Sequence, residues 1–371
     1  MRNNKLLYIN NAASSMNGGV ICSKRNLESI KSIYGKENVV VYILSLELYV
    51  NGSRFFHKYK RIKTILQGYS GNLTKEKENV IFKIIKDLNI DTIFLEYSLM
   101  GKLCKSIKKR FSWVKVITFF HNVEIQYIFN QVKTSKLYYR FYWIILNYWN
   151  ERLSCKYSDK IILLNSRDAN LVKKIYGREP EAIIPVSVND AFDISLIHDQ
   201  RMQDYPFTIL FVGSLFYANV HGIKWFVNNV MQNFPDIILE IVGNDMQKIK
   251  SQVERQNVKV YSSVPSLQEY YNHANLVVMP IFTGGGMKVK TAEALMYGKT
   301  IIGTPEAFCG YDYNPEIGKI CTNKNEFCDA IDYYMKPKSK RFNSFSRDLY
   351  LNKYSFNSTL KKFKDVFNNS I

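Results

Sequence analysis

The sequence predicts an α/β protein of two doubly wound units, each a parallel sheet with helices on both faces. Short runs rich in β-branched and aromatic residues alternate with helical stretches of ten or more residues along the whole chain. The 371 residues exceed the ~150 of one ordinary domain. A polar stretch, residues 187–205, separates two such series and is interpreted as the linker.

Each series contains six expected strands. Those of the first are residues 5–10, 38–44, 91–95, 114–120, 160–164 and 181–185, and those of the second are 207–213, 237–243, 258–261, 275–280, 300–304 and 318–321. Helices separate most of them, so the strands should pair in parallel, with ligands beyond their carboxyl ends in a cleft between the units. The expected domains are residues 1–190 and 205–343, followed by one C-terminal helix, 344–371, that returns to the first domain.

The composition excludes several classes of protein. Hydrophobic residues make up 46% and charged residues 22%, as in soluble globular proteins. The six cysteines have neither zinc-site nor disulfide-framework spacing, and no apolar run approaches the ~20 residues of a membrane span. A cytoplasmic protein is therefore expected. The net charge of +19 favours anionic partners such as phosphorylated small molecules or anionic lipid.

The most informative stretch is residues 279–299, in which a buried strand runs into three glycines, 284–286, and then into a helix. Glycines let a ligand approach the backbone, and the unpaired N–H groups of a helix start attract phosphate. Lys288 and Lys290 fall in the first turn, where the helix dipole disfavours cations unless an anion is present. Glu293 shares a face with Lys290 and can accept hydrogen bonds from sugar hydroxyls. An ordinary turn with a solvated Lys–Glu pair remains the alternative.

His121 is the candidate catalytic histidine because it directly follows an expected strand and opens a helix. Glu124, one turn later, can orient His121 or cap that helix, and capping is favoured. Glu96 also ends a strand and can face the cleft.

Several motifs, in order, give the chain its resemblance to a known family. They are Asn17-Gly18-Gly19, Phe120-His121-Asn122-Val123-Glu124, Ile184-Pro185-Val186-Ser187-Val188-Asn189, Phe211-Val212-Gly213-Ser214-Leu215, Ile241-Val242-Gly243, and Gly284-Gly285-Gly286 with Glu293-Ala294-Leu295. With these motifs the sequence resembles retaining GT-B glycosyltransferases of family four over nearly its whole length. Such enzymes transfer a sugar from a nucleotide diphosphate sugar to an acceptor hydroxyl, with retention and without a required metal or a further cofactor.

The resemblance implies a role for each matching position. Glu293 corresponds to the second acid of an E-x7-E motif and would hold the donor ribose. His121 would lie near the donor sugar and the acceptor hydroxyl, with Glu124 on the acceptor side. The other donor-side positions are Gly213, Ser214, Val264, Gly285, Gly286, Met287 and Lys288, and the other acceptor-side positions are Gly18 and Gly19.

Two positions depart from the family pattern. Gly285 stands where the first acid of E-x7-E would fall, which excludes a carboxylate from that position and favours a front-face reaction. Ser214 stands where many relatives carry an arginine for the diphosphate. Lys288 and Lys290 are the expected replacements and count with His121 as catalytic candidates.

A basic and aromatic region lies in the first half of the chain. Residues 102–178 hold sixteen Lys and Arg against four Asp and Glu, and they include the aromatic run 137–149. This pattern fits peripheral attachment to the anionic inner face of the plasma membrane. It fits equally a helix buried in the fold. No recognised nucleic-acid-binding motif accompanies the charge.

Surface polysaccharide or lipid-linked oligosaccharide synthesis is the pathway implied by the resemblance, with a carbohydrate or lipid-linked acceptor. Two alternatives remain open. One is a sugar-nucleotide epimerase, for which no suitable set of acids is evident. The other is a catalytically silent GT-B subunit that binds carbohydrate or a partner protein, an alternative that the missing acid at Gly285 supports.

Overall fold

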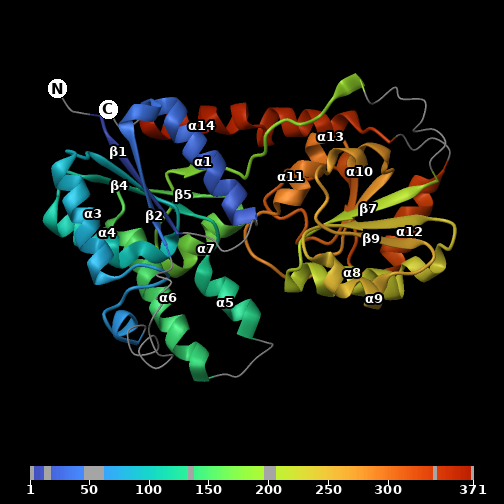
Figure 1. The fold of residues 1–371 in the computed structure, drawn as a ribbon, viewed down its shortest axis with the longest axis horizontal. Coiled ribbons are helices and arrows are strands. Elements are labelled where there is room, and N and C mark those ends of the chain that lie inside the picture. The colour runs from blue at the N-terminus through green and yellow to red at the C-terminus, as the bar shows by residue number, and fades with distance from the viewer. Residues whose placement is uncertain are drawn as a thin grey trace. The chain divides into compact units, whose positions relative to one another are not determined.

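The computed structural model describes residues 4–11, 18–45, 62–132, 138–195, 206–336 and 341–368. The chain divides into two units, one of Met1–Ile184 with Leu360–Ile371 and the other of Pro185–Thr359. Each unit contains a six-stranded sheet whose neighbouring strands are all parallel (Figure 1). The predicted doubly wound α/β fold is therefore confirmed.

The first sheet has the strand order β2-β1-β3-β4-β5-β6. Its strands are β1 (Leu6–Asn11), β2 (Val39–Leu44), β3 (Thr92–Leu95), β4 (Lys115–Phe120), β5 (Lys160–Leu163) and β6 (Ala182–Ile183). The helices of this unit are α1 (Gly18–Tyr34), α3 (Lys75–Asp87), α4 (Gly101–Arg110), α5 (Glu124–Val132), α6 (Tyr138–Tyr157) and α7 (Ser166–Tyr176).

Successive residues of a strand point to opposite faces of the sheet. Because helices cover both faces, the side chains on both sides of the central strands are buried. Leu7 and Ile9 of β1 belong to one core cluster with Ile81 of α3 and Leu103 of α4. The intervening Tyr8 is also buried and stacks on Phe94 of β3. Strands buried on both faces explain the near-continuous apolar runs in the sequence.

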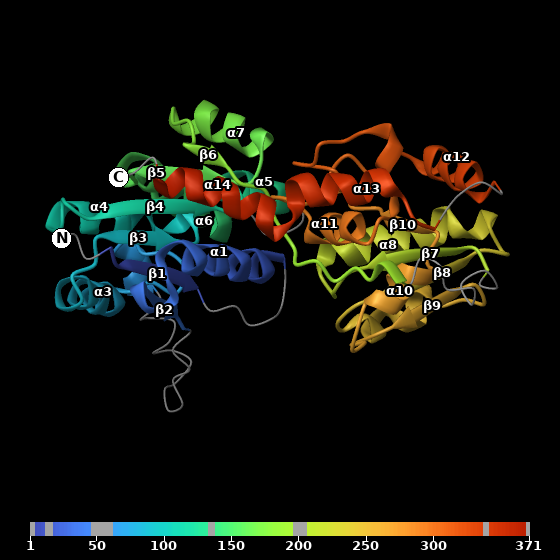
Figure 2. The same cartoon turned by 90° about the horizontal axis from the view of Figure 1, so that it is seen from above.

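The second sheet has the order β12-β11-β10-β7-β8-β9. Its strands are β7 (Thr208–Val212), β8 (Ile238–Val242), β9 (Val258–Tyr261), β10 (Leu276–Met279), β11 (Thr300–Gly303) and β12 (Gly318–Ile320). Its helices are α8 (Tyr217–Asn229), α9 (Lys250–Val253), α10 (Gln268–His273), α11 (Val289–Met296), α12 (Lys324–Met335) and α13 (Ser344–Leu349) (Figure 2).

In each sheet, successive strands along the chain are added first in one direction and then in the other. This direction reverses between the neighbouring strands β1 and β3 in the first sheet, and between β7 and β10 in the second. The connections that leave such a pair of strands diverge to opposite faces, so a crevice opens at their carboxyl ends, where α/β proteins bind ligands. These two points are where a functional site is expected in each unit.

The tail is not the single helix that the sequence predicts. After α13 the chain makes a π-helical turn, Tyr350–Tyr354, and Ser355 is extended before α14 (Phe356–Asn368) begins. The Tyr354 carbonyl accepts a hydrogen bond from Val188 N–H, which removes it from the helical ladder, and Ser355 Oγ accepts one from Ser358 N–H. Tertiary pairing with Val188 therefore explains the break.

The second half of α14 packs on the first unit. In Figure 1 α14 runs beside α1, and the rings of Tyr34 and Phe367 lie 5.3 Å apart between centroids. Phe363 and Phe367 also pack on Phe94, at centroid distances of 6.3 and 6.4 Å.

Candidate functional site

The glycine loop of the second unit joins β10 to α11, one of the two connections at the reversal of the second sheet. Gly286 has φ +58, a left-handed conformation that favours glycine. Lys288 occupies the N-cap position of α11. A lysine side chain has no acceptor atom, so it leaves the first N–H groups of the helix uncapped. The loop and the helix start therefore have the geometry of an anion site.

Lys290 lies beside the other connection at this reversal, the turn after β7. Its Nζ donates a hydrogen bond to Asn219 Oδ1 at 2.7 Å and lies 4.8 Å from the ring centroid of Phe211. A Cβ on Gly213 would stand 2.9 Å from that Nζ, so a side chain at this position would displace the ammonium group. Asn219 Nδ2 in turn donates to the Ser214 carbonyl at 2.9 Å. The structure thus brings together the predicted residues Gly213, Ser214 and Lys290.

The pKa of Lys290 is lowered to about 7, chiefly by burial; the charge of Glu293 opposes this shift, and the charge of Lys288 adds to it. Glu293 lies one turn further along α11 and is half-buried. Burial raises the pKa of its carboxyl group, while the charge of Lys290 opposes the rise. Burial thus disfavours the charged forms of both Lys290 and Glu293, and perturbed pKa values of this kind are typical of binding sites for charged ligands.

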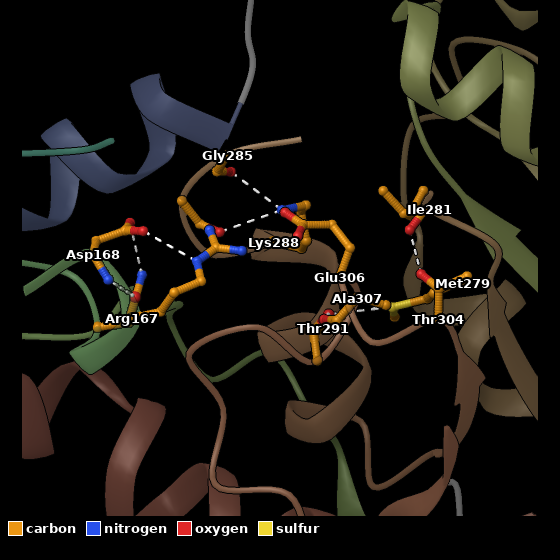
Figure 3. A network of polar contacts seen from close by, with 12 residues as sticks. Arg167, Asp168, Met279, Ile281, Gly285, Lys288, Thr291, Thr304, Glu306 and Ala307 are labelled. Carbon is orange, nitrogen blue, oxygen red and sulfur yellow. Dashed lines mark hydrogen bonds and ion pairs between the residues drawn. The ribbon is translucent and has the colours of Figure 1, made fainter. Parts of the chain in front are cut away.

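Lys288 makes contacts that the sequence did not predict. Its Nζ donates to the carbonyls of Gly285 at 3.2 Å and Gly286 at 3.3 Å, and it forms an ion pair with Glu306 Oε1 at 2.7 Å (Figure 3). The ammonium group thus joins the glycine loop to the segment after β11. Met287, which precedes Lys288 in the loop, is buried.

Val264, the predicted base contact, follows β9 in the turn before α10, next to Ser263 with φ +55. β9 is the edge strand of the sheet, and β8 separates it from β7. No described hydrogen bond or ring contact links Val264 to the glycine loop.

In the first unit, His121 directly follows β4 and is 5% exposed. Its Nε2 lies 2.6 Å from Glu96 Oε2, and Glu96 directly follows β3. Ser23 and Asn26 of α1 donate to the same carboxylate oxygen, at 3.2 and 3.3 Å. The His121 ring stacks on Tyr97 at 4.7 Å. The ends of the adjacent strands β3 and β4, of which β3 borders the reversal of the first sheet, therefore hold a histidine–carboxylate pair.

Glu96 also affects its other neighbours. The pKa of the Tyr8 hydroxyl and that of the Cys22 thiol are raised well above their usual values, first by burial and then by the charge of Glu96. Burial and then Glu96 raise the pKa of Tyr97 to about 12. These three groups therefore stay protonated at neutral pH.

The expected role of Glu124 is wrong on both counts. Glu96, not Glu124, contacts His121, and the start of α5 is capped by Glu151 of α6, which accepts hydrogen bonds from Glu124 N–H at 2.9 Å and Ile125 N–H at 3.1 Å. A glutamate outside the local sequence reaches those amides because α5 and α6 pack together. Burial and the charge of Glu151 raise the pKa of Glu124 to about 7.

Gly18 and Gly19 begin α1, the helix that follows β1, which is one of the two strands at the reversal of the first sheet. They therefore lie at the expected edge of the first sheet. Residues 12–17, which include Asn17, fall outside the described residues.

The described part of the aromatic helix α6 is partly buried and partly exposed. Leu146 is buried, whereas Ile145 is 40% and Trp149 54% exposed, and the side chains of residues 130–142 lie outside the description. Ile145 and Trp149 line a surface cavity of about 280 Å³ together with Ile65, Leu66, Gly68, Lys102, Lys105, Leu146, Asn150 and Leu153. Within the described ranges no helix is long and apolar enough to cross a bilayer, and no group of three or more His, Cys, Asp or Glu side chains is placed to hold a metal.

Comparisons with known proteins agree with this description. Residues 206–336 match the family model "Glycosyl transferases group 1". A relative from Klebsiella pneumoniae, "Uncharacterized 44.6 kDa protein in cps region", is 25% identical over 268 residues, which span 65% of this chain and 66% of the relative.

Two solved structures share the fold over nearly the whole chain. Anabaena Alr3699/HepE in complex with UDP has a TM-score of 0.69 and 12% identity, covering 98% of this chain and 100% of that one. The lipopolysaccharide outer core galactosyltransferase WaaB has a TM-score of 0.66 and 13% identity, covering 99% and 100%. The shared fold and the family match in the second unit together support a glycosyltransferase of GT-B fold.

Proposed function

We propose that this protein is a retaining, metal-independent glycosyltransferase that uses a nucleotide diphosphate sugar. The observation that carries the proposal is the anion site of the second unit, where the glycine loop and the uncapped start of α11 lie beside the Lys290 ammonium group. Backbone amides and one half-buried cation can stabilise a diphosphate without a metal.

The proposed reaction breaks the bond between the anomeric carbon and the diphosphate oxygen. The acceptor hydroxyl oxygen bonds to that carbon from the same side, and its proton passes to the leaving phosphate. Charge builds up on the diphosphate as the bond breaks, so the loop amides and Lys290 act where stabilisation lowers the barrier. Gly285 carries no carboxylate that could attack the sugar from the opposite face.

In the first unit, His121 is proposed to hydrogen-bond the reacting sugar or the acceptor hydroxyl. Glu96 takes up Nε2, so Nδ1 is the ring nitrogen left to act on a ligand. Gly18, Gly19 and Glu124 are proposed to border the acceptor.

Uridine is the proposed donor base, because a protein of the same fold is known in complex with UDP. Synthesis of a surface polysaccharide or lipid-linked oligosaccharide is proposed as the setting. It is supported by the relative from a cps region and by the structural likeness to a lipopolysaccharide galactosyltransferase.

Calorimetry with UDP, GDP, ADP and CMP tests donor binding, and donor hydrolysis without acceptor tests catalysis. We expect micromolar binding of UDP, slow hydrolysis of a UDP-sugar that EDTA does not abolish, and an α-configured first product by NMR from an α-linked donor. Binding without any turnover would instead support a catalytically silent subunit. Interconversion of UDP-sugars would support an epimerase.

An anionic membrane surface is the proposed second partner. It would bind at the cavity that Leu66, Ile145 and Trp149 line together with Lys102 and Lys105. Exposed apolar side chains beside ammonium groups suit the interface of an anionic bilayer. In liposome flotation at low salt, the protein should float with vesicles containing phosphatidylglycerol and not with phosphatidylcholine alone. Equal recovery with both, or with neither, would remove this partner.

A further inference from the structure

The segment after β11 is held tightly against the anion site. Thr304 N–H donates to the Met279 carbonyl at 3.1 Å, and the Thr304 hydroxyl bonds to the Ile281 carbonyl. From α11, the Thr291 hydroxyl donates to the Ala307 carbonyl at 2.8 Å (Figure 3). Glu306 lies between these anchored residues, so the position of its backbone is fixed from both sides.

This arrangement brings the Glu306 carboxylate to the glycine loop. Its Oε1 lies 2.7 Å from Lys288 Nζ, and the two side chains are 18% and 13% exposed. A Cβ on Gly284 would stand 3.4 Å from the same oxygen, in van der Waals contact. The loop whose own sequence offers no acid therefore has one beside it, supplied by the segment that follows β11.

The pair is poorly explained as a stabilising ion pair. A partly buried ion pair contributes little net stability, because desolvation offsets most of the attraction. It does, however, keep a charged acceptor in one orientation beside a loop that a ligand approaches. An ionised carboxylate has about four acceptor positions, so Glu306 can accept further hydrogen bonds while it remains paired with Lys288.

We infer that Glu306 accepts hydrogen bonds from hydroxyl groups of the donor sugar, and that Lys288 positions it for this contact. The inference deepens the proposed function and rests on it. If the diphosphate binds at the loop and the start of α11, the attached sugar lies within reach of the loop's border, where hydroxyl donors need an acceptor. A carboxylate is the strongest such acceptor among protein side chains.

The test separates recognition of the sugar from recognition of the nucleotide. In Glu306→Gln, the Kd for UDP should stay within about twofold of the wild type. The kcat/KM for the preferred donor, chosen from UDP-glucose, UDP-galactose and UDP-N-acetylglucosamine, should fall by ten- to a hundredfold. Glu316→Gln, an exposed acid on the same connection to β12, is the matched control and should change neither quantity.

Donor analogues lacking one hydroxyl complete the experiment. With the wild type, the analogue that lacks the contacted hydroxyl should be a poorer donor than the intact sugar nucleotide. With Glu306→Gln, the analogue and the intact donor should react equally well. Unchanged donor kinetics in Glu306→Gln, or equal losses for UDP and for the donor, would overturn the inference. In the latter case Glu306 only shapes the loop. A wild-type protein that binds no UDP would defeat the proposed function itself.

Discussion

At the scale of single residues, the pairing of His121 with Glu96 defines what the first unit can do. A carboxylate that accepts from Nε2 fixes the orientation of the ring, and Ser23 and Asn26 fix the carboxylate in turn. Such a chain of hydrogen bonds is a common way to hold a histidine ready for proton transfer or for contact with a substrate.

Glu96→Gln should lower kcat about 10- to 100-fold, because the amide keeps the shape of the side chain and loses the charge that orients the imidazole. The pH profile of kcat should also change shape, whereas a purely structural defect would lower kcat by the same factor at every pH. Steady-state kinetics from pH 5.5 to 9 provide the measurement.

The second unit offers a matched control, since His273 Nε2 lies 2.6 Å from Glu240 Oε2 in a pair that is also buried. Glu240→Gln should destabilise the protein as much as Glu96→Gln and leave the pH profile unchanged. Identical profiles for the wild type and Glu96→Gln would refute the positioning role of Glu96.

Lys290 should couple nucleotide binding to proton uptake. With a pKa of about 7, the amine is mostly neutral at pH 8 in the unliganded protein. A diphosphate beside it raises that pKa, so roughly half to one proton should be taken up per UDP bound. Calorimetry at pH 8 in buffers of different ionisation enthalpy measures this number.

Lys290→Ala should abolish the proton uptake and reduce kcat/KM by about ten- to a thousandfold. Lys259→Ala, on the exposed face of β9, serves as the control that retains both. A binding enthalpy that does not depend on the buffer would contradict the proposed role of Lys290.

At the scale of elements, α14 contributes to the first unit through aromatic packing. Phe363 is 1% exposed and lies 6.4 Å from the ring of Phe119 as well as against Phe94. Phe363→Ala should lower the free energy of unfolding of this unit by about 3 to 5 kcal/mol, through lost burial and the cavity left behind. Urea unfolding is the measurement.

The control for this prediction is Phe345→Ala in α13, where the ring is 52% exposed. It should cost less than about 0.5 kcal/mol. If both substitutions had equally small effects, α14 would not be an integral part of the first unit.

At the scale of the whole molecule, stability should depend on the half-buried acid Glu124. Its pKa is about 7 in the folded protein and near 4.5 when unfolded. Between these values the native state binds more protons than the unfolded state, so stability falls as the pH rises from about 4.5 to 7 and is constant above. The loss amounts to about 2 to 3 kcal/mol.

Glu124→Gln should therefore flatten the decline between pH 5 and 7 and raise stability at pH 8. Urea unfolding at four pH values checks this, with the exposed Glu28→Gln as a control that keeps the wild-type slope. A variant that is no more stable than the wild type at pH 8 would contradict the assigned cost of burying this carboxylate.

Much of the architecture could be predicted from the sequence because it depends on local patterns. Apolar runs of strand length, separated by helical periodicity, predict parallel sheets, and all twelve expected strands are present, although β6 is reduced to Ala182–Ile183. The glycine loop and His121 were also found locally, because strand ends that lead into glycines or helices are recognisable along the chain. The roles of these site residues remain predictions.

The partners of these residues depend on the tertiary structure, since the groups that meet there are far apart in sequence. Glu96 lies 25 residues from His121, and Lys288 lies 18 residues from Glu306. Glu306 carried one local signal, an acid just past an expected strand, whereas Asn219 and Glu151 carried none. The sequence by itself determined the two sheets and the position of the glycine loop, through periodicity and glycine conformation. Strand order and helix packing alone decided which carboxylate meets each cation or imidazole, because parallel strands bring distant chain segments to one edge.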